Sequence, residues 1–229
     1  MAADPAAQAR AKERAEATAK VHADARARWA EDAKKDWDAF PFTTARLGSE
    51  IAEAIKGHDY VLTGANAVIN WMLRTTSVDK PERFIGSALG TATQIGLGLG
   101  VALAYRGTGK LVVDVQPDGD LMFDAGALWT AAQSKLPMLV VMHNNRAYYN
   151  DWNHQIHLAQ ERERPVENAY IGQAINDPAP DFAGLARSMG WYAEGPIENP
   201  ADIQPALQRA IKEVQAGRPA LVDTITQFQ

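Results

Sequence analysis

The spacing of apolar residues changes along the chain, and each change marks an expected element. Leu47, Ile51 and Ile55 recur at helical spacing, with Thr44 placed to cap this helix and Gly57 to end it. This amphipathic helix should pack on a sheet. Further helices are expected over 125–134, 182–189 and 200–216, and in the later part of a glycine-rich run that ends near 105.

Short apolar runs rich in β-branched residues predict the strands. They cover 60–62, 111–115, 138–142, 191–193 and 220–225. The order strand, helix, strand over 111–142 is a βαβ crossover, which implies parallel strands with a right-handed connection. We therefore expect an α/β fold in which a parallel sheet is flanked by helices. Ligands of such sheets bind at the carboxyl ends of the strands.

The segment from 6 to 39 has a different composition. It consists almost wholly of Ala, Arg, Lys, Glu and Asp, mostly strong helix formers, and its apolar residues are too small to build a core. Its large apolar residues are Val21, Trp29, Trp37 and Phe40. The segment is either a solvated helix lying on another surface or a partly frayed linker. We expect residues 1–45 to form a charged helical extension and residues 46–229 to form the domain.

Composition excludes several classes of function. The 46% hydrophobic and 22% charged content is ordinary for a soluble globular protein, and no run of about 18 apolar residues could span a membrane. A net charge of −5 argues against nucleic acid as a partner. The chain has no cysteine, which excludes disulfides, thiolate zinc sites and thiol nucleophiles. Without a secretory signal, the expected location is the cytoplasm.

The informative polar residues follow two neighbouring strands. Asp118 comes after the strand at 111–115 and Asn145 after the strand at 138–142, so both should lie at one edge of the sheet. Magnesium prefers hard oxygen ligands and often completes its shell with phosphate oxygens. A protein that supplies one carboxylate, one amide oxygen and one main-chain carbonyl as ligands can bind Mg²⁺ in this way.

This pattern resembles the cofactor motif of thiamine diphosphate (ThDP) enzymes of the acetolactate synthase, 2-oxoacid decarboxylase and 2-hydroxyacyl-CoA lyase type. That motif is Gly-Asp-Gly, just under thirty further residues and a paired Asn; here Asn145 follows Asp118 by 27 residues. The resemblance implies the diphosphate-binding domain of these enzymes. It further implies that Asp118, Asn145 and the carbonyl of Ala147 hold the Mg²⁺ that anchors the cofactor's diphosphate.

The chain departs from the family motif at two positions. Pro117 stands where the first Gly is usual, and its missing N–H removes any main-chain contact from that position. Asp120 stands where a small hydroxyl residue is frequent, which would place a second carboxylate near an anion. We expect the backbone N–H groups of Gly119 and Asp120 to suffice for the diphosphate.

The resemblance also implies contacts to the organic part of the cofactor. Gly90 and Thr91 resemble a Gly-Thr segment whose backbone contacts the aminopyrimidine ring. The hydrophobic wedge that bends ThDP is Leu89, Ala92 or Ile95, and the sequence does not choose among them. The other glycines of this run serve either close packing or ligand contact.

Residues after the paired Asn often face the substrate in this family. We take Tyr148, Tyr149, His154 and Gln155 as the candidates for catalysis, within a segment that also holds Asn150 and Trp152. For His154 and His157 the alternative is an exposed helical histidine, and His143 is expected to be packed at a strand end. Asn66 follows a strand, and two roles stay open for it: contact with the cofactor, or a structural role at the strand end.

One catalytic group of the family has no counterpart in the sequence. In these enzymes a Glu on a separate pyrimidine-binding domain activates the cofactor, and residues 1–45 offer no such domain. We therefore expect a split enzyme in which a second subunit carries that domain, in a complex of two copies of each chain or a multiple of it. Its substrate would be a small carbonyl compound such as a 2-oxoacid, or a CoA thioester.

Two other functions stay open at this point. The first is a ThDP-binding or regulatory subunit without catalysis, for which Pro117 and the absent Glu would be the evidence. The second is a nucleotide-binding α/β module, although the sequence lacks a phosphate-loop lysine motif and a well-placed dinucleotide fingerprint.

Overall fold

The computed structural model describes residues 4–64, 66–86 and 90–228, and within these ranges it confirms the expected parallel sheet. Six strands lie side by side in the order β2-β1-β3-β4-β6-β5, and every neighbouring pair is parallel. The strands are β1 (Tyr60–Gly64), β2 (Phe84–Gly86), β3 (Leu111–Pro117), β4 (Leu139–Asn144), β5 (Tyr192–Ile197) and β6 (Ala220–Ile225).

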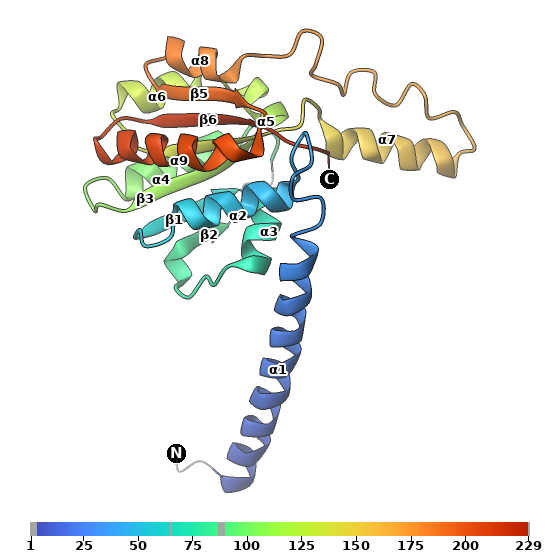
Figure 1. Cartoon of the computed structure of the whole chain (residues 1–229), viewed down its shortest axis with the longest axis vertical. Coiled ribbons are helices and arrows are strands. Elements are labelled where there is room, and N and C mark those ends of the chain that lie inside the picture. Colours follow the sequence, from blue (N-terminus) through green and yellow to red (C-terminus); the bar gives the residue numbers. More distant parts are fainter. Residues whose placement is uncertain (1–3, 65, 87–89, 229) are drawn as a thin grey trace.

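Helices cover both faces of the sheet (Figure 1). One face packs against α2 (Thr44–Ala54), α3 (Ala67–Thr75) and α9 (Pro200–Gln215). The other packs against α4 (Gln94–Ala104), α5 (Asp118–Phe123), α6 (Ala127–Gln133) and α8 (Phe182–Ser188). The strands read as continuous apolar runs because a parallel sheet is buried on both faces. Val113 of β3 thus joins the first core and Val112 the second.

Several elements were not predicted from the sequence. These are α3, β2, α5, the short 3-10 helix η1 (Pro81–Arg83) and the long α7 (Tyr149–Glu161). The cap of α2 was assigned one residue too late. Thr43, whose backbone is extended, accepts a hydrogen bond from Arg46 N at 3.0 Å, whereas Thr44 is already helical.

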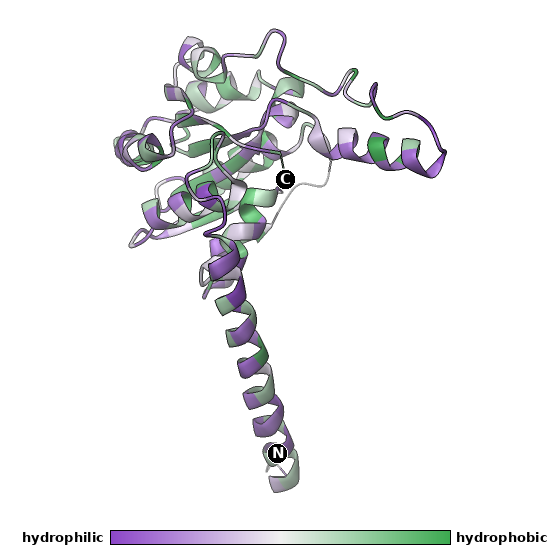
Figure 2. Cartoon of the chain, turned by 45° about the vertical axis from the view of Figure 1, so that its right-hand side comes forward, coloured by the Kyte–Doolittle hydropathy of each residue, from purple (hydrophilic) through white to green (hydrophobic). Residues whose placement is uncertain are grey.

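The N-terminal segment forms α1 (Pro5–Asp32), which projects away from the domain (Figure 1). Every residue of α1 is exposed or half-buried, and hydrophobic and hydrophilic residues mix along its length (Figure 2). Trp29 is half-buried beside Arg74, while Val21 is 69% exposed and is no anchor. Near the base of the helix, Arg26 Nη1 donates to Thr76 O at 3.0 Å. Among the described residues, no helix combines the length and apolar character that a membrane crossing requires.

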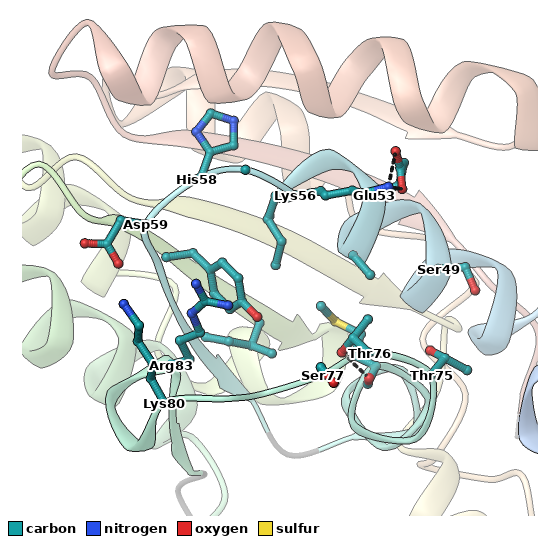
Figure 3. A pocket seen from close by; sticks show the side chains of 16 residues that line it. Ser49, Glu53, Lys56, His58, Asp59, Thr75, Thr76, Ser77, Lys80 and Arg83 are labelled. Carbon is teal, nitrogen blue, oxygen red and sulfur yellow. Dashed lines mark hydrogen bonds and ion pairs between the residues drawn. The ribbon is translucent and has the colours of Figure 1, made fainter. Parts of the chain in front are cut away.

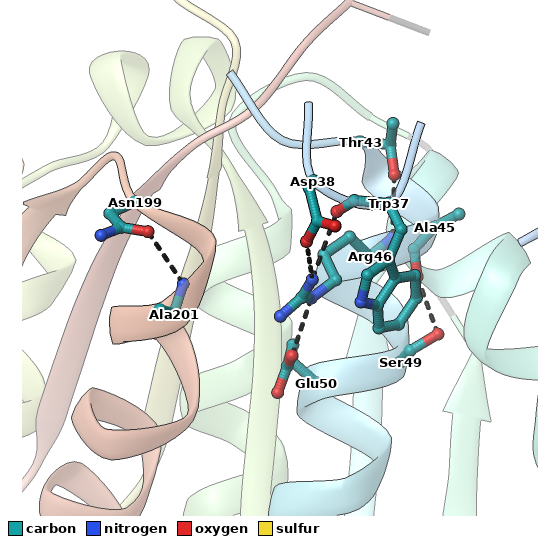
Figure 4. A network of polar contacts seen from close by, with 9 residues as sticks. All are labelled: Trp37, Asp38, Thr43, Ala45, Arg46, Ser49, Glu50, Asn199 and Ala201. Carbon is teal, nitrogen blue, oxygen red and sulfur yellow. Dashed lines mark hydrogen bonds and ion pairs between the residues drawn. The ribbon is translucent and has the colours of Figure 1, made fainter. Parts of the chain in front are cut away.

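Arg46 fastens the segment after α1 to the domain (Figure 4). Its guanidinium lies 4.3 Å from the centre of the Trp37 ring and donates to Glu50 Oε1 at 2.7 Å. It also donates to the main-chain oxygen of Trp37 at 3.2 Å and to Asp38 at 3.4 Å. The Arg46 and Glu50 side chains are 11% and 14% exposed, so their ion pair is shielded from water, whereas Asp38 is 90% exposed. Phe40, at the end of the same segment, stays 67% exposed.

Replacing Arg46 by Ala should lower the free energy of unfolding by about 1–3 kcal/mol, because Glu50 and the Trp37 carbonyl lose a charged donor. Arg14→Ala, a change of the same chemistry on the exposed part of α1, is the control and should cost far less. Urea denaturation measures both. Equal losses in the two variants would show that the Arg46 contacts contribute nothing.

Candidate functional site

The pairing of β3 with β4 brings the two motif residues to one edge of the sheet. Pro117 and His143 are register partners, so Asp118 and Asn145 each leave the sheet just beyond a matched pair. A cavity of about 330 Å³ opens there. Its walls are Asn66, Gly90, Thr91, Gln94, Pro117, Asp118, Gly119, Asp120, His143, Asn145, Ala147, Tyr148, Tyr149, Asn150 and Asp151.

Asp118 and Asn145 converge on one main-chain group. The N–H of Ala147 donates to Asn145 Oδ1 at 3.0 Å and faces Asp118 Oδ2 at 3.3 Å. The second carboxylate oxygen, Oδ1, accepts from Gly119 N at 2.8 Å. Among the described residues, no main-chain N–H donates to the main-chain oxygen of Ala147. Asp118, Asn145 and Ala147 thus line one small cavity and are linked through the Ala147 N–H.

Burial disfavours the charged form of the Asp118 carboxyl. The residue is 2% exposed, and burial raises the pKa of its carboxyl to about 7, although the N–H groups of Gly119, Arg146 and Ala147 oppose that rise. The charge of Asp223 raises the pKa further. A divalent cation beside Asp118 would offset this cost, and the three oxygens are the donor types that Mg²⁺ takes. In the described ranges no cluster of three or more His, Cys, Asp or Glu offers another metal site.

Gly119 is required by a side chain from the neighbouring strand end. A Cβ at this position would lie 2.5 Å from Cδ1 of Tyr148, closer than real contacts allow. The Tyr148 ring also lies 5.6 Å from the Phe123 ring, centre to centre. Burial, with the charges of Asp118 and Asp120, raises the pKa of the Tyr148 hydroxyl. Tyr148 therefore forms a neutral aromatic wall beside the motif.

The Asp120 side chain serves the loop that carries Gly90 and Thr91. Its carboxylate accepts from Ala92 N at 2.5 Å, from Gln94 N at 3.1 Å and from Gln116 Nε2 at 3.2 Å. Ala92 has a φ of +69°, an unusual conformation for a residue with a side chain. Because three donors share the charge of Asp120, its repulsion of a bound anion should be weaker than that of a free carboxylate.

A buried polar network lies under this loop and was not found from the sequence. Gln94 Nε2 donates to Asp114 Oδ1 at 2.6 Å and to Thr63 Oγ1 at 3.1 Å. Burial raises the pKa of the Asp114 carboxyl to about 8; Gln94 opposes this rise and the charge of Asp120 adds to it. The sequence does hold a signal for this network: Asp114 lies inside an apolar strand, where a carboxylate needs a hydrogen-bond partner.

Asn144, the first Asn of the pair, stabilises the turn after β4. Asn144 Nδ2 donates to Asp223 Oδ1 at 3.0 Å, and Asn144 Oδ1 accepts from Arg146 N at 3.2 Å. Arg146 has a φ of +58°, which turns the chain so that Ala147 faces Asp118. Burial raises the pKa of the Asp223 carboxyl to about 6, and the hydrogen bond from Asn144 opposes that rise. Asp223 was missed because it lies far away in sequence, on β6.

The segment after the paired Asn divides into two groups. Tyr148 and Tyr149 line the cavity, whereas His154 and Gln155 are exposed on α7 and do not. Figure 1 shows α7 extending away from the sheet, which separates its later turns from Asp118. His157 is likewise exposed. Near the cavity, Tyr149 stacks on Phe228 with ring centres 4.6 Å apart, and Trp152 packs edge-on against both rings.

The other candidates of the sequence have defined places. Asn66 lines the cavity, but its side chain caps α3 through Ile69 N at 3.1 Å and donates to Val115 O at 2.9 Å. His143 is packed at its strand end as expected, and burial lowers its pKa to about 4. Ile95 lies in the second core, and Leu89 falls outside the described residues.

Comparison with known proteins gives a consistent family. Residues 64–224 match the family described as "Thiamine pyrophosphate enzyme, C-terminal TPP binding domain". The acetolactate synthase isozyme 3 large subunit of Escherichia coli (strain K12) is 32% identical over 148 residues, which are 63% of this chain and 24% of that protein. A 2-hydroxyacyl-CoA lyase of Oryza sativa subsp. japonica is 29% identical over 137 residues, which are 57% of this chain and 21% of that protein. The chain therefore spans about a quarter of the length of these relatives.

Solved structures show the same fold. The thiamine diphosphate-dependent 4-hydroxybenzoylformate decarboxylase of Rhodococcus jostii has a TM-score of 0.69 at 20% identity, with 83% of this chain and 34% of that chain covered. The benzoylformate decarboxylase from Polynucleobacter necessarius has a TM-score of 0.65 at 20% identity, with coverages of 82% and 34%. These likenesses establish the architecture of the domain.

The buried Asp114 predicts how stability depends on pH. The folded chain holds this proton up to about pH 8, whereas an unfolded chain loses it near the ordinary value of 3.8, so unfolding becomes easier as pH rises between these values. Asp114→Asn keeps an oxygen for Gln94 and removes the charge. At pH 8 this variant should be more stable than the parent by about 1–3 kcal/mol, and near pH 4 the difference should vanish.

Urea denaturation of the ligand-free chain at several pH values measures this difference. Asp118 and Asp223 are unchanged in both proteins, so their own titrations largely cancel in the comparison. Asp124→Asn, on an exposed carboxylate, is the control and should leave the curve unchanged. A parent and Asp114→Asn variant that keep a constant difference from pH 4 to pH 8 would contradict the assignment.

Proposed function

Because the chain belongs to the thiamine pyrophosphate enzymes and carries their C-terminal cofactor-binding domain, we propose that its cavity beyond β3 and β4 holds Mg²⁺ and the diphosphate of ThDP. The metal ligands of this chain would be Asp118, Asn145 and the main-chain oxygen of Ala147. The convergence of Asp118 and Asn145 on the Ala147 N–H is the observation that carries the proposal. The remaining ligands would come from the diphosphate.

The rest of the cavity wall fits the other parts of the cofactor. The N–H groups of Gly119 and Asp120 would face the diphosphate, and the Gly119 N–H, which here donates to Asp118 Oδ1 at 2.8 Å, would be shared with it. Gly90 and Thr91 would lie beside the aminopyrimidine ring. All four residues line the same cavity. The hydrogen bonds from Ala92 and Gln94 to Asp120 support this role, because they fix the loop of Gly90 and Thr91 before any ligand arrives.

The reaction class follows from the cofactor. Bound ThDP supplies an electron sink for making or breaking a carbon–carbon bond next to a carbonyl. This chain would bind and orient the cofactor, and Tyr148 and Tyr149 would close the wall that faces a small carbonyl substrate. The substrate would be a 2-oxoacid or a 2-hydroxyacyl-CoA thioester, since the relatives include acetolactate synthases and a 2-hydroxyacyl-CoA lyase. His154 and Gln155 could reach that substrate only if α7 moves or a partner brings the substrate to them.

We also propose that a second polypeptide supplies the pyrimidine-binding domain with its activating Glu. The matched region is the C-terminal domain, and none of the described residues that line the cavity is a Glu. Apolar side chains beside the cavity support a partner there: Phe123, which contacts Tyr148, is 59% exposed, and Phe228, which stacks on Tyr149, is 43% exposed. A complex with two copies of each chain would give two such sites.

A non-catalytic ThDP-binding subunit is the alternative that one observation favours. Pro117 lines the cavity at the motif's first position and has no N–H to offer the diphosphate. This alternative shares the binding site and differs only in catalysis. The two functions therefore separate in an activity measurement and not in a binding measurement.

Replacing Asp118 by Ala should weaken ThDP binding in the presence of Mg²⁺ by about 100-fold or more, because the metal loses its only carboxylate ligand from this chain. Calorimetry on the assembled complex measures the affinity, and circular dichroism checks that the domain stays folded. Asp124→Ala, on the exposed carboxylate after α5, is the matched control. Unchanged affinity in Asp118→Ala would refute the metal site.

The isolated chain should be catalytically silent, and the complex with a pyrimidine-domain subunit should be active. Hydrogen–deuterium exchange at the thiazolium C2 of added ThDP reports the activation step directly. The chain alone should leave this exchange at the rate of free cofactor, and the complex should accelerate it. Acceleration by the lone chain would overturn the split arrangement, while a complex that binds ThDP without acceleration would favour the non-catalytic alternative.

A further inference from the structure

A second cavity lies at the opposite end of β1 from the cofactor site, and it has no role in the function proposed above (Figure 3). Its volume is about 750 Å³, against about 330 Å³ for the cofactor cavity. Cavities that bind small molecules fall in this range. The wall is built from one stretch of chain, from Ser49 at its start to Arg83 at its end. The hollow is therefore part of this domain's own fold.

The floor of the cavity is apolar. Ile55 at the end of α2, Leu62 of β1 and Met72 of α3 line it, and all three belong to the buried core on this face of the sheet. A ligand that reaches this floor would need an apolar body.

One wall of the cavity is cationic. Lys80 and Arg83 rise from the segment before β2 toward the turn at Asp59 (Figure 3). Both cations help to lower the pKa of the Asp59 carboxyl, after its stronger partner Lys110. Asp59 also lines the cavity, but it is paired with Lys110 at 2.8 Å, so it offsets the charge of Lys80 and Arg83 only in part. Lys80 has no ion pair within 4 Å among the residues that the structure describes.

Arg83 is fixed in place but not saturated. Its guanidinium lies 4.9 Å from the centre of the Tyr60 ring, and Nη1 pairs with Asp79 at 2.9 Å. Nε is buried and has no hydrogen-bond partner in the described part of the chain. A buried guanidinium N–H without a partner is unfavourable, and a small rotation of the side chain would turn it toward an anion in the cavity.

Three of the hydroxyl groups that line the cavity already donate their protons to main-chain oxygens. Ser49 donates its hydroxyl proton to Ala45 O at 2.9 Å, and Thr75 donates to Trp71 O at 2.8 Å. Thr76 is bonded to Met72 O in the same way. These three oxygens keep only acceptor capacity, so the charged lining would select an anion. Lys56 of that lining is already paired with Glu53 at 3.2 Å, so the contribution of Lys80 and Arg83 is the larger one.

We propose that this cavity binds an organic anion whose apolar body lies on Ile55, Leu62 and Met72 and whose carboxylate or phosphate group pairs with Lys80 and Arg83. The site is independent of the cofactor cavity. Thr76 forms part of its rim and is also the residue that Arg26 of α1 contacts, so an occupied cavity lies directly against the attachment of α1.

Methionine-methyl NMR on the full chain tests this site, with octanoate, octyl phosphate and neutral 1-octanol as probes. Met72 lines the cavity, whereas Met122 on α5 lies at the cofactor end of the sheet and serves as the internal control. Either anion should shift the Met72 resonance in a saturable way, leave Met122 in place and bind about tenfold more tightly than 1-octanol. The ratio of the two anions then identifies the preferred head group.

Lys80→Gln should weaken the binding of both anions by about tenfold or more, and so should the double variant Lys80→Gln/Arg83→Gln. The binding of 1-octanol should not change in either variant. Lys12→Gln, on exposed α1, is the matched control and should bind as the parent does. Lys80→Gln alone keeps Arg83 on Tyr60, so it tests the charge even if the double variant fails to fold. An unshifted Met72, equal shifts at Met122, or octanoate and octyl phosphate binding unchanged in Lys80→Gln would overturn the proposal.

Discussion

The parallel pairing of β3 with β4 is the constraint on which the site depends. Because the strands run in the same direction and Pro117 faces His143 in register, Asp118 and Asn145 leave the sheet side by side. The αL turn at Arg146 then points the Ala147 N–H at both oxygens. A parallel sheet offers this arrangement wherever two neighbouring strands end together, so the chemistry here comes from two polar residues on an otherwise apolar framework.

Buried carboxylates at the site are electrostatically unfavourable, and a bound cation would stabilise one of them. Asp118, Asp114 and Asp223 are buried, and burial raises the pKa of each carboxyl. The chain meets this cost with amide donors: Gln94 to Asp114, Asn144 to Asp223 and main-chain N–H groups to Asp118. Among these three acids, only Asp118 also lines the cavity together with Asn145 and Ala147, which carry the oxygen types that a hard cation takes. This difference explains why one acid is a candidate metal ligand and two are structural.

Sequence patterns located the strands and the motif because both are local signals. Apolar β-branched runs marked β3 and β4, and the spacing from Asp118 to Asn145 marked the site. The same reasoning could not find Asp223, because its partner Asn144 is 79 residues away and only the sheet order brings them together. Nor could it find the partners of the Asp120 side chain, since the loop N–H groups that share its charge come from 26 and 28 residues earlier. His154 and Gln155 were grouped with Tyr148 because all of them follow the paired Asn. The structure instead shows the alternative, in which His154 and His157 are exposed on helix α7.

The two ends of the sheet differ in chemistry. Carboxylate and amide oxygens line the cavity at the carboxyl end of β3 and β4, whereas the cavity at the amino end of β1 has both cationic and acidic side chains in its wall. The central claim concerns the first of these. Its most direct test is anomalous diffraction from a crystal of the complex grown with ThDP and Mn²⁺ in place of Mg²⁺. Our account predicts one anomalous peak within about 2.5 Å of Asp118 Oδ2, Asn145 Oδ1 and the Ala147 carbonyl oxygen, with the diphosphate completing the shell. A peak elsewhere, or a bound cofactor whose metal does not touch Asp118, would contradict it.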